Sequence, residues 1–381
     1  MRKIVDTLLP TTMVGSYPRP LWFRHQLHGR DILEAFKLEE HEQAFTDATA
    51  SVIRDQEHAG LDVVTDGQMH YDDYGGGIGS FVWYWYERLP GFFPGKMEHP
   101  LVAGGKAAPD EVDAMNNWGG TTTTGPIQRG PIRLANLYRR AARVANRPLK
   151  VSVGAGPCNL PLHVYYGEDA HYHDLKALAA DLVPIFNAEL KELVAAGADF
   201  LQLEDLGAWL PVMTGDYSDS DWVAETINRT IDGVDAKIAW HFCLGNAYGN
   251  PSEMFAGVLA KVLPPLFASD VEQFVLDFSW RDMRDVVALK NLPADKEVAA
   301  GVIDVRTLDV ESAETVAGRV RKVLEYVPAE RVYLTTDCGL HSLPRLTAQE
   351  KLGALVRGAA IVRAELEGRP VEEREPAAVV A

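Results

Sequence analysis

The chain has 381 residues, of which 47% are hydrophobic and 24% charged, and this composition is typical of a globular protein with a large core. Its formal net charge of −17 argues against nucleic acid or an anionic membrane as a partner, because binding to phosphate groups requires a basic surface. Three cysteines are too few for a disulfide framework, and no run reaches about 18 apolar residues, so we expect a protein of the reducing cytoplasm without a membrane span.

Short apolar runs rich in β-branched residues recur along the chain, separated by helical stretches. They span residues 11–16, 61–65, 149–153, 200–203, 236–240, 274–276, 298–303 and 332–334. Eight such runs alternating with helices predict parallel βα units, and the length fits one α/β barrel of the (β/α)8 or TIM type over residues 1–366. The alternative is a doubly wound open sheet, although no glycine-rich nucleotide motif follows any run.

A long excursion, from about 69 to 148, follows the second predicted strand and is rich in glycine and aromatic residues. We expect an insertion with some secondary structure, because structureless loops of this length are rare. It could cap the mouth of the barrel and exclude water, or it could form a minor core or the interface of a homo-oligomer. Residues 367–381 are predicted to be a frayed C-terminal tail.

In barrels of this type the chemistry lies where the strands end. The residues just past each predicted strand are therefore the candidates: Ser16, Gln68, Glu204, His241, Cys243, Asp277, Asp304, Arg306 and Cys338. Several have a structural alternative. Ser16 could cap a turn, Glu204 could cap the next helix, and Asp304 with Arg306 could form a structural ion pair.

His241 and Cys243 lie two positions apart at the end of an apolar run, so their side chains can point to one side of an extended strand. Cys338 follows another such run and could complete three ligands of a borderline-soft cation, for which zinc is the natural choice. Three protein ligands leave a fourth position for a substrate. The alternative is a pair of buried cysteines beside a hydrogen-bonded histidine.

With these residues in line, the sequence resembles the catalytic barrel of the cobalamin-independent methionine synthases over nearly its whole length. The motifs that carry the resemblance are the Gly15-Ser16 opening, the Asp-Val-Val-Thr-Asp-Gly run at 62–67, His241-Phe242-Cys243 and Asp337-Cys338-Gly339. The resemblance implies one zinc ion per chain on His241, Cys243 and Cys338. It also implies a thiol substrate that binds the metal as thiolate and attacks an alkyl donor.

The departures from the family pattern concern the substrate. Gln68 stands where the synthases carry a carboxylate for the amino group of homocysteine, whereas Glu204 keeps a carboxylate at the second such position. Asp277 replaces a glutamate ligand of the metal and is a tentative fourth ligand. Arg306, after Asp304, replaces a histidine assigned to acid–base work, and its planar guanidinium suits an anion.

These departures point to an anionic thiol without an amino group, such as coenzyme M, which a branch of the family adds to epoxides. On this interpretation Arg306 binds the sulfonate, while Ser16, Gln68 and Glu204 complete the substrate site. The thiolate opens a short aliphatic epoxide to a 2-hydroxyalkyl thioether. The candidates for protonating the alkoxide or orienting the groups that do so are His70, Tyr71, Tyr74, His341, Asp205 and Asp304.

Two alternatives remain open. The first is methyl transfer to homocysteine or another thiol from a methylated folate or methylcobalamin. The second is a non-catalytic carrier of a methyl group or corrinoid, although the chain has no Asp-x-His-x-x-Gly motif for a corrinoid ligand.

Overall fold

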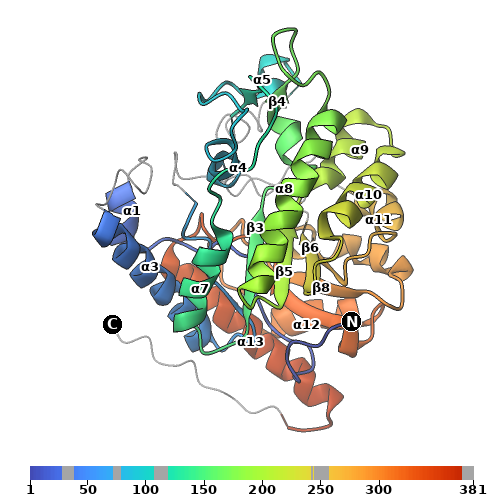
Figure 1. Ribbon diagram of the computed structural model, residues 1–381. Coiled ribbons are helices and arrows are strands. Elements are labelled where there is room, and N and C mark those ends of the chain that lie inside the picture. The colour runs from blue at the N-terminus through green and yellow to red at the C-terminus, as the bar shows by residue number, and fades with distance from the viewer. Residues whose placement is uncertain (28–37, 72–78, 107–118, 242, 244–256, 371–381) are drawn as a thin grey trace.

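The computed structural model describes residues 1–27, 38–71, 79–106, 119–241, 243 and 257–370, and Figure 1 shows a curled parallel sheet surrounded by helices. The sheet order is β1-β3-β5-β6-β7-β8-β9, and every neighbouring pair is parallel. The predicted TIM-barrel class is confirmed. The strands are β1 (Val64–Thr65), β3 (Leu149–Gly154), β5 (Phe200–Glu204), β6 (Lys237–His241), β7 (Gln273–Asp277), β8 (Glu297–Ile303) and β9 (Val332–Thr336).

The first predicted strand closes the barrel through a short stretch of backbone. Thr11 forms an isolated parallel bridge to Leu334 of β9, and Thr12 N donates to Leu334 O at 2.9 Å. On the other side, Val63 N donates to Thr11 O at 3.1 Å. The segment therefore lies between β9 and the residues that lead into β1, and all eight predicted runs belong to the wall.

A helix or helical turn follows each wall segment in chain order. Both faces of the strands are buried, as expected for a parallel sheet covered by helices. The sixth unit, which begins with β7, uses a 3-10 helix, η5, in place of an α-helix. The ring consists of α3 (Leu38–Ala59), α7 (Leu134–Val144), α8 (Leu175–Ala195), α10 (Asp219–Ile231), α11 (Leu259–Leu266), η5 (Arg284–Asn291), α12 (Ala313–Leu324) and α13 (Arg345–Leu366).

The hydrophobic core has two parts. The larger one lies between the strands and the helices, and the smaller one is formed by residues of the strand wall. This inner cluster takes one residue from each of seven wall segments. It contains Val14, Val63, Phe200, Ala239, Val275, Ala299 and Tyr333. Two fully buried lysines, Lys150 on β3 and Lys237 on β6, also lie on these strands. The barrel interior is therefore packed but not purely apolar.

The aromatic excursion packs onto the barrel, and Figure 1 shows α4 (Gly79–Tyr86) and α5 (Pro100–Ala103) at one end of the molecule. Trp85 of α4 stacks on Phe186 of α8 with ring centroids 4.1 Å apart, and its indole N–H donates to Gly154 O. A short strand, β2 (Thr121–Thr122), pairs with β4 (Val164–Tyr165). Helix α7 contacts α3 and α8 and so belongs to the ring.

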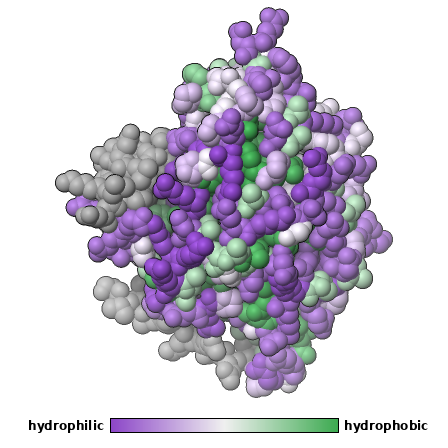
Figure 2. All heavy atoms as spheres, in the orientation of Figure 1, coloured by the Kyte–Doolittle hydropathy of each residue, from purple (hydrophilic) through white to green (hydrophobic). Residues whose placement is uncertain are grey.

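The remaining short elements are α1 (Leu21–Leu27), α9 (Trp209–Thr214), η1 (Leu160–His163), η2 (Leu206–Ala208), η4 (Ser279–Arg281) and η6 (Ala329–Arg331). The end of the predicted tail, residues 371–381, lies outside the described residues. Among the described helices, none is long and apolar enough to span a bilayer. The face drawn in Figure 2 is mainly hydrophilic, with hydrophobic residues visible in narrow strips.

Candidate metal centre

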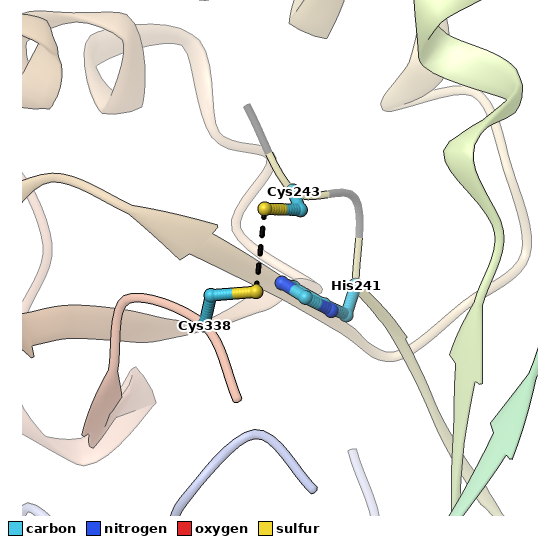
Figure 3. A group of neighbouring side chains, drawn as sticks. All are labelled: His241, Cys243 and Cys338. Atoms are coloured by element: carbon cyan, nitrogen blue, oxygen red, sulfur yellow. Dashed lines mark hydrogen bonds between the residues drawn. The ribbon is translucent and has the colours of Figure 1, made fainter. Parts of the chain in front are cut away.

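His241, Cys243 and Cys338 converge at the carboxyl ends of β6 and β9, as Figure 3 shows. One ligand atom from each lies within 4.8 Å of the others, and the two sulfur atoms are 3.3 Å apart. His241 ends β6, while Cys338 follows β9 by two residues. Residues nearly a hundred positions apart therefore form one compact group with the donor atoms that zinc prefers.

Glu204, the last residue of the neighbouring strand β5, orients the imidazole of His241. Nδ1 of His241 donates to Glu204 Oε2 at 2.6 Å, and Nε2 has no hydrogen-bond partner among the described residues. Burial lowers the pKa of His241, but the Glu204 carboxylate outweighs it and the pKa is raised overall. A carboxylate on one ring nitrogen is the arrangement that prepares the other nitrogen for a metal.

The two thiols behave as one ionising pair. Cys243 donates to Cys338, and this contact raises the pKa of Cys243 well above its ordinary value and lowers that of Cys338. The buried sulfur pair lies beside Nε2 of His241, for which the described residues provide no hydrogen-bond partner. A soft divalent cation would satisfy these electron-pair donors. The residues present therefore fit the predicted metal.

Asp337, next to Cys338, fixes the loop that carries the thiol. Its carboxylate accepts backbone hydrogen bonds from Phe278, Ser279 and Trp280 at 3.0–3.1 Å. Burial raises the pKa of Asp337 to about 6, and Arg306 opposes this shift. The start of the β7–β8 connection and the Cys338 loop are thus tied together.

Arg306 adds side-chain contacts to this connection between the two loops. Its guanidinium contacts Asp337 Oδ2 at 3.1 Å and Asp277 Oδ2 at 3.0 Å, and it stacks over Trp280 at 4.8 Å. Only 4% of the Arg306 side chain is exposed. The two carboxylates outweigh the effect of burial and raise its pKa. The structural ion pair weighed for Arg306 is present, but with Asp277 and Asp337 as the close partners.

Asp277, the tentative fourth ligand, lies outside the three-residue metal group. Its Oδ2 pairs with Arg306, while its Oδ1 has no hydrogen-bond partner among the described residues. Asp304 accepts a hydrogen bond from the backbone N–H of Arg306 at 2.9 Å and so stabilises its own turn. Direct ligation by Asp277 stays a prediction.

The three residues of the metal group line a cavity. Its lining includes five of the predicted substrate and catalytic residues, but Arg306, Asp304 and His70 are not among its described lining residues. The polar residues that line it include Ser16, Tyr17, Arg19, Gln68, Tyr71, Glu204, His241, Cys243, Cys338 and His341. Of the described lining residues, Arg19 is the one lysine or arginine.

Tight backbone turns bring Ser16 and Gln68 to this cavity. Gln68 has φ of 55°, a left-handed conformation that is unfavourable for a residue with a side chain, and Asp66 Oδ1 accepts its N–H at 2.9 Å. Ser16 Oγ lies 3.1 Å from His341 Nδ1. A Cβ on Gly339 would stand 1.8 Å from Ser16 Oγ, so only glycine allows this approach.

The predicted proton donors separate into two groups. Tyr71 lines the cavity, and burial together with the Glu204 charge raises its pKa well above the ordinary value, so the phenol stays protonated. His70 is buried against Tyr71 and Tyr84, and burial lowers its pKa to about 3, so it stays neutral. Asp205 accepts backbone hydrogen bonds from Cys158 and Gly207 instead. Tyr74 lies outside the described residues.

Arg19 and Trp209 line the cavity but were not predicted from the sequence. Arg19 lies three residues beyond Ser16 in the same strand-end loop, and that position was the available signal. Trp209 begins α9 and donates its indole N–H to Cys243 O at 2.6 Å. Trp209 therefore lines the cavity and forms a hydrogen bond with the backbone of Cys243.

The comparisons with known proteins identify the family of the chain. The model of the cobalamin-independent synthase catalytic domain matches residues 9–83 and 146–361, so its gap falls in the aromatic excursion. A 2-hydroxypropyl-CoM lyase of Xanthobacter autotrophicus is 32% identical over 396 residues, covering 95% of this chain and 96% of the lyase. A methionine synthase of Saccharolobus solfataricus is 32% identical over 362 residues, covering 94% and 96%. The solved structure of a B12-independent methionine synthase from a Shewanella species has a TM-score of 0.77 and 27% identity, covering 95% of this chain and 100% of that one.

Proposed function

The chain belongs to the family of cobalamin-independent synthase catalytic domains, and within it we propose a zinc-dependent thiol alkyltransferase in which coenzyme M opens a short aliphatic epoxide. One zinc ion per chain would be held by His241, Cys243 and Cys338. When bound, the ion supplies a positive charge that lowers the pKa of a substrate thiol, so that the thiol reacts as thiolate near neutral pH.

The choice of thiol rests on the hydrogen bonds that the Glu204 carboxylate already accepts. Its Oε2 accepts from His241 and its Oε1 accepts from Gln202, so both oxygens of this cavity carboxylate already have partners. Gln68, the other residue at the amino-binding position, is neutral and cannot form an ion pair with an ammonium group. The cavity therefore suits a thiol without an amino group better than it suits homocysteine.

Arg19 is the residue we assign to the anionic end of the thiol. Arg306, predicted for this role, is engaged by two buried carboxylates and is not among the described lining residues. Arg19 lines the cavity with Ser16 and Gln68, and its charge contributes to lowering the pKa of His70. A guanidinium beside two neutral hydrogen-bonding side chains matches a sulfonate.

The reaction balances without an organic cofactor. The thiolate sulfur forms a bond to the less hindered epoxide carbon, the carbon–oxygen bond breaks, and the electron pair remains on oxygen as an alkoxide. The proton lost by the thiol is restored to that oxygen. We assign the delivery of this proton to His341, which contacts Ser16 at the cavity, or to the protonated phenol of Tyr71, which also lines the cavity.

A reducing, cytoplasmic setting fits this chemistry, because two free thiols 3.3 Å apart would otherwise be oxidised. The second candidate function is methyl transfer to homocysteine or another thiol. It is favoured by the methionine synthase of S. solfataricus, which is as similar to this chain as the lyase is.

The experiment that tests the proposal mixes zinc-loaded protein with coenzyme M and epoxypropane, and runs homocysteine in parallel. We expect loss of free thiol and a product with the mass of 2-hydroxypropyl-coenzyme M, with homocysteine unreactive. Zinc bound without adduct, together with methylation of homocysteine by a folate or corrinoid donor, would favour the second candidate. Binding of a methylated corrinoid without turnover of any thiol would indicate the carrier.

A further inference from the structure

A continuous chain of hydrogen bonds runs from the middle of the barrel to the candidate metal ligand. Lys150 on β3 is fully buried and donates from Nζ to Gln202 Oε1 and, at 2.8 Å, to Met13 O. Gln202 on β5 donates from Nε2 to Glu204 Oε1. Glu204 Oε2 then accepts the Nδ1 proton of His241 at 2.6 Å.

The chemistry of its two ends fixes the direction of every bond in this chain. A lysine side chain with its amine buried donates to the carbonyls it meets, and an ionised carboxylate only accepts. The amide of Gln202 therefore points its oxygen at Lys150 and its nitrogen at Glu204. With the amide reversed, an oxygen would face the Glu204 carboxylate, which is unfavourable in a buried site.

The same side chains also hold the first wall segment, which has a single backbone bridge to β9. Met13 O accepts from Lys150, and Val14 O accepts from Ser152 Oγ and from Gln202 Nε2, each at 2.8 Å. This segment leads directly to Ser16 at the cavity. The buried side chains of Lys150 and Gln202 thus contact the segment before Ser16, and Gln202 also contacts the carboxylate that orients His241.

We propose that Lys150 and Gln202 are positioning residues of the metal site, which fix the orientation of Glu204 and therefore of the His241 imidazole, and which hold the backbone before Ser16. This inference rests on the proposed function for the presence of a metal, but not for the identity of the substrate. Neither residue touches the metal group or substrate, so they act through Glu204 and the first wall segment.

Two substitutions and a matched control test the inference. Lys150→Met removes the donor while keeping an unbranched side chain, and Gln202→Glu keeps the shape while placing an oxygen against Glu204. The control is Lys237→Met, which removes another fully buried lysine that pairs with Glu297 and takes no part in this chain of hydrogen bonds. The readouts are Co²⁺ affinity by chelator competition and the cobalt–thiolate absorption spectrum, on variants whose folding is checked by circular dichroism.

We expect Lys150→Met and Gln202→Glu each to weaken Co²⁺ binding by about tenfold and to change the cobalt spectrum, as loss of outer-sphere partners does. Lys237→Met should bind Co²⁺ with wild-type affinity and spectrum. Wild-type affinity and spectrum in Gln202→Glu, the near-isosteric variant, would overturn the inference while leaving the proposed function intact. Failure of the unmodified protein to bind Co²⁺ would overturn both.

Discussion

Nη2 of Arg306 lies 3.0 Å from Oδ2 of Asp277, and both side chains are buried beside the candidate metal site. One carboxylate oxygen of Asp277 thus pairs with the guanidinium. The other terminal nitrogen of that group, Nη1, pairs with Asp337. The arginine that the sequence suggested as an anion anchor is therefore part of the support beneath Cys338.

This relationship predicts the effect of Arg306→Met. The change leaves two buried carboxylates without their cation, so we expect a loss of about 3–5 kcal/mol in the free energy of unfolding, measured by urea denaturation. Under folding conditions the KM for coenzyme M should stay within about twofold of wild type. A tenfold rise in that KM with unchanged stability would return the anion-binding role to Arg306.

Substitution of Arg19 should have the opposite pattern. Arg19→Ala removes a charge-assisted contact of about 1.5–3 kcal/mol, which corresponds to a rise of roughly 10- to 100-fold in the KM for coenzyme M. 2-Mercaptoethanol, which lacks the anionic group, serves as the matched substrate and should be unaffected. An equal effect on both thiols would contradict a role of Arg19 in anion recognition.

Glu204→Gln tests the orientation of His241. The amide can still accept the Nδ1 proton, but it lacks the charge that makes Nε2 a strong ligand. We expect metal affinity to fall by about 10- to 100-fold, measured by competition with a zinc chelator. Unchanged affinity would mean that the contact of 2.6 Å has no influence on the metal.

The pH dependence of stability reports on Lys150. Burial lowers the pKa of Lys150 to about 7, and the charge of Glu204 opposes that shift. The unfolded lysine titrates near pH ~10.4, so between about pH 7 and 10 the unfolded chain holds a proton that the folded chain has released. Lys150 therefore makes its most favourable contribution at high pH, and that contribution is lost as pH falls toward 7.

We expect the free energy of unfolding of wild type, relative to Lys150→Met, to rise by about 1 kcal/mol per pH unit above about pH 7. Urea denaturation of both proteins at several pH values between 7 and 9 measures this difference, in which the other titrating groups cancel. A difference that stays constant with pH would show that Lys150 titrates as an exposed lysine does.

Much of the fold and the three metal-group residues could be predicted from the sequence because both depend on local signals. Apolar runs mark strands wherever they fall, and parallel strands bring their carboxyl ends together, so His241, Cys243 and Cys338 could be grouped across nearly a hundred residues. Glu204 was also identified at a strand end, but its contact with His241 depends on the register of β5 against β6.

The partners of buried charged groups could not be predicted in the same way. Arg306 follows a strand as the true cavity residues do, and only the placement of Asp277 and Asp337 draws its guanidinium away. Arg19 enters the cavity from a loop three residues past the predicted strand end. Lys150 lies within an apolar run that indicated a strand and no more. Side-chain pairing across the barrel decides each of these roles.

The most direct test of the account is titration of the cobalt-substituted protein with coenzyme M and, separately, with homocysteine. We predict that coenzyme M changes the cobalt–thiolate absorption at low concentration, while homocysteine requires a concentration at least tenfold higher, because Gln68 is neutral and Glu204 is already hydrogen-bonded to His241 and Gln202. Homocysteine that binds as tightly as coenzyme M or more tightly would contradict the assignment of an anionic thiol without an amino group.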